Sequence, residues 1–449
     1  MLEATKQLGN YLQEFSRFEK SIGAKPSWVH SLRQAAMQRF AERGFPTTKD
    51  EEWRFTSVAP ITRNVFELAT PTTVSPDAPA HIARLGLGEW NRSELVFVNG
   101  RFSPEFSSIR SLPQGAFVGS LSKALETKRD LVEPHLASYA GYRENSFAAL
   151  NTAFLVDGAF VFLPKGGVVE EPIHLVFLSA PGDTPTVSHP HNLIVAESGS
   201  QARIVESYAG MDGIGYFTNA TTEVVAGESA NLDHYKLQRE SDQAFHVATL
   251  HFQLERSATV STHSISLGGG LVRNDINAVL DGEGGDLTLN GLYVVGGEQH
   301  VDHHTVIDHA KPHCTSRELY KGILNERAQA VFNGRVIVRP DAQKTDAQQT
   351  NKNLLLSDEA LVNTNPQLEI NADDVKCAHG ATIGQLDADV LFYLRSRGID
   401  IETARHLLTL GFMSDINSKI KVDAIRSELE RTLFAGLPAP AKVGDGTPR

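Results

Sequence analysis

The period of hydrophobic and polar positions changes twice along the chain. Near the N-terminus, Trp28, Leu32, Ala36 and Phe40 recur every three to four residues, and Gly44 follows as a plausible helix stop. From about residue 150 to 375 the pattern consists of short alternating runs broken by Gly, Asn and Asp, which is typical of strands. We therefore predict an N-terminal helical and mixed region (1–148), a mainly β core (149–380), a C-terminal helical region (381–436) and a disordered tail (437–449).

The alternating region also contains a repeat. "GSQARI" begins at Gly199, "GESANL" at Gly227 and "ERSATV" at Glu255, so the step from copy to copy is constant, and a looser copy, "GGDLTL", begins at Gly284. A second track keeps the same step through three alternating trios: Ala220, Thr222 and Val224; Ala248, Leu250 and Phe252; Ile276, Ala278 and Leu280. Strands that recur at a fixed step predict a stacked coil whose inward side chains form one continuous core.

A β-helix fits this repeat best. The alternative is a β-sandwich, which also has short strands and regular turns but does not require a constant step between strands. The ends of a β-helix are unpaired strand edges that need covers. We expect the helical regions at both termini to provide them.

Composition narrows the functional classes. The 449 residues are 41% hydrophobic and carry a net charge of −12, which argues against a nucleic-acid backbone as the general partner. No apolar run approaches the ~20 residues needed to cross a bilayer. The N-terminal stretch carries Glu3, Glu14 and Glu19 and lacks the features of a signal or transit peptide. We expect a cytoplasmic protein, with no membrane or nucleic-acid partner.

The stretch "GGEQHVDHHTVIDHAKPHC" concentrates histidine and aspartate, which suit zinc or iron. Strand alternation would place His300, Asp302 and His304 on one face and His303 and His309 on the other. The weaker metal candidates are His300, Asp302 and His304 on one face, together with Cys314 at the end of the stretch. The favoured interpretation is a structural polar ladder along a solvated face, and the polar run "DAQKTDAQQTNKNLLLS" is interpreted as side chains that bond from one turn of the coil to the next.

Cys377 and His379 are a more specific pair. Residues i and i+2 of an extended segment point to the same side, and this pair lies at the end of the predicted coil. An edge strand at that end could accept a second protein by strand addition. A thiolate and a neutral imidazole both bind iron, but two ligands do not close a site. The pair is therefore interpreted as half of a site; the alternative is a small buried thiol beside a satisfied histidine.

At this point the sequence resembles a known family. "DDVKCAHGATIGQLDADVLFYLRSRGI" with "ARHLLTLGF" is similar to the C-terminal signature of the SufB/SufD family of iron–sulfur cluster assembly proteins. "PHCTSRELYKGIL", "VFNGRVIV" and "DEEWRFTSVAPI" are similar to other parts of the family, so the match covers most of the chain. Gly380 after His379, together with the length, resembles the SufD branch; SufB-type chains usually have Glu at that position.

The resemblance implies a right-handed β-helix in a scaffold subunit that is not an enzyme. It implies a complex with SufB, paired through the β-helix, and with the ATPase SufC, and it leaves room for a homodimer of the isolated chain. Cluster formation is expected at the SufB–SufD interface, with His379 and Cys377 as this chain's ligands. Contacts with SufC are expected in the C-terminal helices, at Phe392, Tyr393, Arg395, Arg397, Gly398, Gly411 and Phe412.

The resemblance further implies a transient iron–sulfur cluster or iron at the interface, with no cofactor held tightly by this chain alone. Complexes of the family can also carry a reduced flavin. No phosphate-binding loop is visible, so ATP hydrolysis would belong to another subunit. Two alternatives remain. One is a stand-alone metal-dependent or carbohydrate-active β-helix that uses the His300–His313 cluster; the other, within the family, is SufB.

Overall fold

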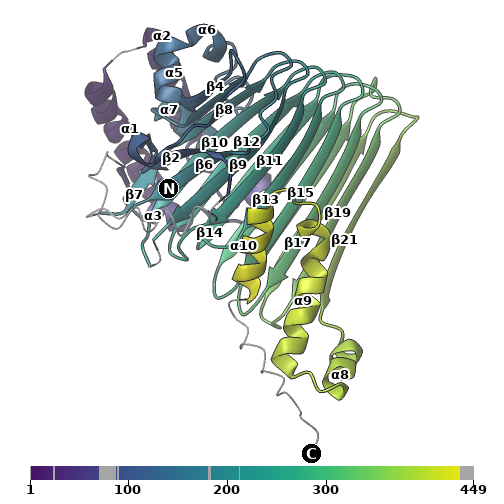
Figure 1. Cartoon of the computed structure of the whole chain (residues 1–449). Helices are drawn as coiled ribbons and strands as arrows, with labels where there is room; N and C mark the ends of the chain where they lie inside the picture. The colour runs from purple at the N-terminus through teal and green to yellow at the C-terminus, as the bar shows by residue number, and fades with distance from the viewer. Residues whose placement is uncertain are drawn as a thin grey trace, which may run out of the picture.

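The computed structural model describes residues 2–23, 26–69, 87, 90–180, 184–211 and 213–434. Its core is a β-helix in which each coil contributes one strand to each of two sheets (Figure 1). Strands alternate between the sheets along the chain, and neighbours within a sheet are parallel through the main body of the core. The predicted β-helix is confirmed. The predicted tail at 437–449 lies outside the described residues.

One sheet has 11 strands among the described residues and is called sheet A. Its members are β4 (Phe117–Ser120), β5 (Ala159–Leu163), β8 (His191–Ala196), β10 (Phe217–Ala226), β12 (Phe245–Leu254), β14 (Leu271–Leu280), β16 (His300–His309), β18 (Gln329–Val338) and β20 (Leu361–Ile370), with β1 (Glu67–Leu68) and β7 (Thr186–Ser188) attached through β10.

The other sheet, sheet B, has 10 described strands. They are β3 (Arg101–Phe102), β2 (Ser93–Val98), β6 (Ile173–Ser179), β9 (Gln201–Gly210), β11 (Asn231–Arg239), β13 (Thr259–Ser266), β15 (Asp286–Val295), β17 (Thr315–Leu324), β19 (Asp346–Leu355) and β21 (Lys376–Gln385).

The step between coils is less regular than the sequence predicts. Phe217 pairs with Phe245, which keeps the predicted step, but Gln201 pairs with Asn231, which makes that step two positions longer. Between β13 and β15 the step is one position shorter than predicted. The repeat aligns Ile204 with Leu232, but in the structure Ile204 lies beside His234, two positions further along. The corners between strands absorb these differences, so every strand keeps its inward-facing positions although the paired residues change.

The corners that lead from a strand of sheet A to the next strand of sheet B share one backbone geometry. The corner residue has a positive φ angle in each coil, and its N–H donates to a carbonyl oxygen of the following coil. Ser229 donates to Arg256 O at 2.9 Å, and His313 donates to Gln343 O at 2.9 Å. His313 thus occupies a structural corner in the same stack as Gly199 and Gly284.

The N-terminal region covers one end of the β-helix and the adjacent outer face of sheet A (Figure 1). Trp53, Val58 and Phe66 pack against Phe217 and Leu271 on that face. The helices of the region are α1 (Leu2–Ile22), α2 (Ser27–Arg43), η1 (Glu51–Trp53), α3 (Ala59–Arg63), η2 (Pro104–Phe106), α5 (Leu121–Thr127), α6 (Arg129–Val132) and α7 (Ser146–Ala153). Gly44 is the predicted stop of α2, with a φ of 67° and its N–H bonded to Phe40 O.

The C-terminal helices are α8 (Ala388–Ser396), α9 (Ile401–Asn417) and α10 (Asp423–Phe434). Apolar side chains of α9, α10 and their connection, including Met413, Ile416 and Ile425, pack on the outer face of sheet B. Helix α8 projects beyond the β-helix (Figure 1). The prediction that the C-terminal helices cover the end of the β-helix is wrong, because α9 and α10 pack on a sheet face and the described side chains of β21 stay exposed or half-buried. The last strand runs to Gln385, so the predicted boundary at 380 falls inside β21.

Among the described helices, none is both long and apolar enough to span a membrane.

Candidate functional site

The last coil carries the Cys377–His379 pair at the open end of the β-helix. Strand β21 pairs with β19, and β20 pairs with β18; neither has a second strand neighbour among the described residues. Cys377 lies in register with Ala347, and His379 with Gln349. Ala347 and Gln349 are buried and face the interior, so both members of the pair share the inward-facing side of the final strand.

The two side chains differ in their surroundings. Cys377 is half-buried and packs against the inner core, and this burial raises the pKa of its thiol. His379 is exposed. An added Cβ at Gly380 would meet no atom within 4 Å, so the backbone beside the pair is open. The prediction that Cys377 and His379 lie on the same side of one strand is confirmed. The Cys377 thiol is partly accessible.

Behind His379 the interior is polar. Glu318, Gln349 and His379 form one row across β17, β19 and β21. The Nε2 of Gln349 donates to the Oε2 of Glu318 at 2.7 Å, and burial raises the pKa of Glu318 to about 7. Beside this row, the Nδ2 of Asn351 donates to the hydroxyl oxygen of Tyr293 at 3.2 Å. The predicted bonding from coil to coil in this polar segment is therefore present.

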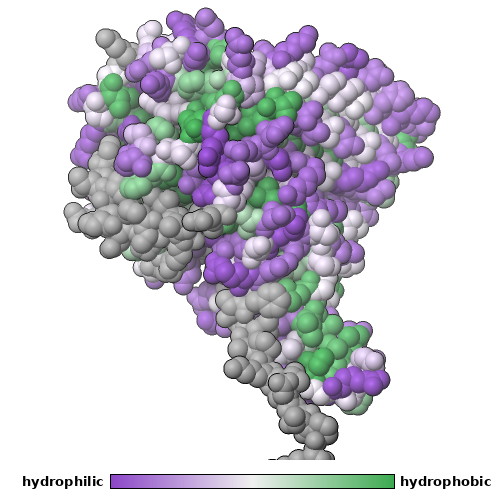
Figure 2. Space-filling model, in the orientation of Figure 1, coloured by the Kyte–Doolittle hydropathy of each residue, from purple (hydrophilic) through white to green (hydrophobic). Residues whose placement is uncertain are grey.

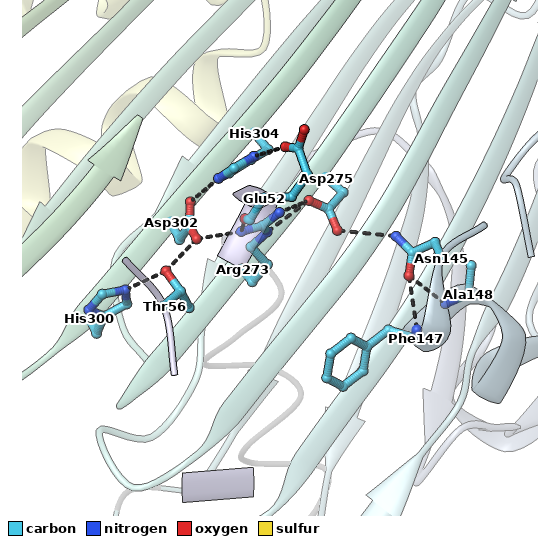
Figure 3. A network of polar contacts seen from close by, with 10 residues as sticks. All are labelled: Glu52, Thr56, Asn145, Phe147, Ala148, Arg273, Asp275, His300, Asp302 and His304. Atoms are coloured by element: carbon cyan, nitrogen blue, oxygen red, sulfur yellow. Dashed lines mark hydrogen bonds and ion pairs between the residues drawn. The ribbon is translucent and has the colours of Figure 1, made fainter. Parts of the chain in front are cut away.

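His300, Asp302 and His304 do share one face, as alternation predicts, but the face is not solvated. It lies under the N-terminal segment around η1 (Figure 3). Thr56 donates to Asp302 and accepts from the Nε2 of His300 at 2.9 Å. The Nδ1 of His304 lies 3.0 Å from the Oε2 of Glu52. Contacts with the N-terminal segment thus engage all three side chains.

Arg273 is the centre of this network. It is 2% exposed, donates to Asp275 at 2.8 Å and to Asp302 at 2.6 Å, and stacks on the Trp53 ring at 4.2 Å. Although burial alone would raise the pKa of Asp302, Arg273 and His304 hold that pKa well below its usual range. Burial alone would lower the pKa of His304, but Asp302 raises it. The network fastens the N-terminal segment to sheet A.

The structure does not bring Cys314 to these three residues. Its side chain belongs to the inner core, and its Sγ donates to Gly282 O at 3.3 Å. Burial raises the pKa of this thiol. Across the described ranges, no three His, Cys, Asp or Glu side chains are grouped so that they could hold a metal ion. Cys314 is thus a corner thiol within the packed interior.

The predicted contact residues lie on α8, directly after it, and on α9. Phe392 and Tyr393 on α8 are 74% and 55% exposed, and α8 carries hydrophobic surface (Figure 2). Phe412 on α9 is half-buried, and the Nζ of Lys321 lies 4.8 Å from its ring centre. The other predicted residues are Arg395 on α8, Arg397 and Gly398 after it, and Gly411 on α9. Helix α8 therefore offers the free surface, while Phe412 helps to anchor α9.

Sequence reasoning missed Arg273, Thr56 and Glu318. Thr56 and Asp302 are far apart in the sequence, so no local pattern joins them. Glu318 could have been found from strand alternation, because it lies at an inward-facing position of β17.

Comparisons with known proteins agree with this architecture. Residues 5–175 match the SufBD protein N-terminal region, and residues 177–412 match the SufBD core domain of the SUF system for FeS cluster assembly. An iron–sulfur cluster assembly SufBD family protein of Synechocystis sp. is 36% identical, over 95% of each chain. The iron–sulfur cluster assembly protein SufD of Escherichia coli is 30% identical over 96% of this chain and 98% of its own. SufD of Bacillus subtilis is 28% identical over 94% and 98%. The chain therefore belongs to the SufBD family of iron–sulfur cluster assembly proteins.

Proposed function

We propose that this chain is a non-catalytic, cytoplasmic scaffold subunit of an iron–sulfur cluster assembly complex. It pairs with a SufB-type chain at the open end of the β-helix and with the SufC ATPase through its C-terminal helices. The observation that carries the proposal is the position of Cys377 and His379, side by side on a final strand with no second strand neighbour in the described chain.

The open end is suited to a protein partner. Exposed strand edges invite pairing with another chain, and proteins normally cover them or use them. Apolar side chains are also exposed on the last two strands: Leu361 is 50% exposed, Ile370 43% and Ile383 47%. A SufB-type chain that docks here would bury this surface and bring its own side chains next to Cys377 and His379.

The chemistry of the pair suits iron as cargo. Thiolate and neutral imidazole are both iron ligands, and the partner or the sulfur of the growing cluster would supply the remaining ligands. Each ligand must lose its proton before it binds, so cluster formation weakens as the pH falls. The raised pKa of the Cys377 thiol makes this competition between iron and proton stronger.

The C-terminal helices connect the site to an ATPase. Only Leu386 and Asp387 separate β21 from α8, and Asp387 caps α8 by accepting from the N–H groups of Asp389 and Val390. Helix α9 is held on sheet B by Lys321, whose Nζ lies 2.6 Å from Asp415. A partner that binds the exposed face of α8 and moves this helix would therefore also move β21, the strand that carries the site.

Co-expression with SufB-type and SufC-type chains tests the proposal. Ile383→Lys should reduce recovery of the SufB-type chain, because it places a charge on the open edge, and Phe392→Asp should reduce recovery of SufC alone. Ile109→Lys changes a residue that is 45% exposed on another part of the surface and serves as the control. Recovery of both partners at control levels with both variants would contradict the assignment of the two surfaces.

A further inference from the structure

Gln349 lies directly behind His379 and has an unused hydrogen-bonding atom. The two residues are paired in register on β19 and β21. Gln349 is 1% exposed, and its Oε1 receives no hydrogen bond within the described chain. A buried amide oxygen without a donor costs free energy. Such an atom one strand behind an exposed imidazole indicates that its donor arrives from the open end.

Glu318 determines which end of the Gln349 amide faces inward. Its Oε2 accepts from the Nε2 of Gln349 at 2.7 Å, and Glu318 is itself 3% exposed. A carboxyl oxygen attracts the amide nitrogen, so the carbonyl oxygen is left for a different partner. Because Glu318, Gln349 and His379 lie in one row, the next side chain along that row is the imidazole.

Gly334 on the opposite sheet provides the space for this amide. A Cβ at Gly334 would lie 2.3 Å from the Nε2 of Gln349 and 2.9 Å from its Cδ. Gly334 is not among the glycines with positive φ, so its backbone does not require glycine. The absence of a side chain at Gly334 instead leaves room for Gln349. The added Cβ would also lie 2.8 Å from the Phe332 ring.

We propose that Gln349 is a positioning residue for the metal-assembly site: its Oε1 accepts a ring N–H of His379 and leaves the other ring nitrogen for iron. This inference rests on the proposed role of His379. A histidine that binds a metal commonly donates its second ring N–H to an oxygen, which fixes the orientation of the ring and makes the ligand more basic. Glu318 acts one step further back by holding the amide in this orientation.

The test measures Co²⁺, as a substitute for ferrous iron, bound by the complex of the full chain with its SufB-type partner. Gln349→Met keeps the approximate size of the side chain and removes the acceptor, and it should weaken Co²⁺ binding about 10-fold or more. Gly334→Ala should have a similar effect from the other sheet, because it displaces the amide while Gln349 stays in place. The matched control is Gln348→Met, which makes the same substitution at the neighbouring, outward-facing position.

A second readout separates positioning from a structural role. In the Zn²⁺-loaded complex with ¹⁵N-labelled histidine, His379 should show a slowly exchanging ring N–H that is lost in Gln349→Met and kept in Gln348→Met. If Gln349→Met and Gly334→Ala bind Co²⁺ like the control and keep this signal, while His379→Ala loses binding, the inference is overturned and the proposed function stands. If His379→Ala also binds normally, the proposed ligand role is wrong as well.

Discussion

The two ends of the β-helix are built differently. At the first coil, β4 pairs antiparallel with β5 and β3 pairs antiparallel with β2, and helices α5 to α7 pack over the adjoining surface. At the last coil, β20 and β21 each pair with one strand, and most of their side chains are exposed or half-buried. Phe97 near the first coil is fully buried, whereas Ile383 on the last is 47% exposed.

The difference fits the proposed division of roles, in which the covered end serves stability and the open end serves assembly with a partner. An uncovered edge is a liability for a protein that works alone, because it offers unpaired N–H and C=O groups to any extended chain. Here the chain covers one end with its own residues and leaves the other uncovered among its described residues. The open end also carries the thiol–imidazole pair, so the lack of a cover coincides with candidate chemistry.

The largest expected effect comes from a matched pair of truncations. Phe97→Ala should lower the free energy of unfolding by about 3–5 kcal/mol, because it removes a ring stacked on Phe177 at 4.9 Å. Ile383→Ala should cost less than about 1 kcal/mol in the isolated chain, since that side chain is already half in water. Chemical denaturation measures both. Equal losses would remove the distinction between the ends.

A pH-dependent effect should come from Glu318, beneath the open end. Burial raises the pKa of this carboxyl to about 7, so the folded protein holds the proton more tightly than the unfolded chain does. The contribution of Glu318 to the free energy of unfolding should therefore fall from about pH 4.5 to 7 and then remain lower. Glu318→Gln removes this charge, and its free energy of unfolding at pH 8 should exceed that of the wild type by about 1–3 kcal/mol.

Denaturation curves of the two proteins at pH 4 and pH 8 measure this difference. A stability difference that is the same at both values would show that Glu318 is ionised in the folded protein without penalty.

The smallest effect on stability is expected at α8. Phe392→Asp should change the free energy of unfolding by less than about 0.5 kcal/mol, because the ring is 74% exposed, while it reduces recovery of the SufC-type partner. Thermal unfolding of the isolated chain and co-purification are the measurements. A large loss of stability would mean that α8 is part of the folded core rather than a docking helix.

Strand alternation made much of the fold predictable from sequence. Which residues of a strand face inward depends on a two-residue period, so the opposite faces of His303 and His304 followed from the sequence alone. The constant step between coils was wrong in detail because corner length is decided locally. Ser229, Ser257 and His313 have positive φ angles at these corners. Because none of them is a glycine, the sequence does not mark the corner.

The polar networks were less predictable because their members are far apart in sequence. For His300, Asp302 and His304 the sequence favoured a structural role over metal binding but placed them on a solvated face. The contacts with Thr56 and Glu52 of the N-terminal region, which bury this face, were not predictable. Cys377 and His379 were easier to find because they lie on the same strand. The support behind them, Gln349 and Glu318, depends on strand register, which the sequence does not state.

The most direct test of the proposed assembly site is the iron–sulfur absorbance of the purified complex that carries His379→Ala in this chain. The variant should fold, recover both partner subunits at wild-type levels and lack the iron–sulfur absorbance of the wild-type complex. His313→Asn, at an exposed corner of the same β-helix, should retain that absorbance. An intact iron–sulfur signal in the His379→Ala complex would contradict the claim that the open end holds this chain's share of the assembly site.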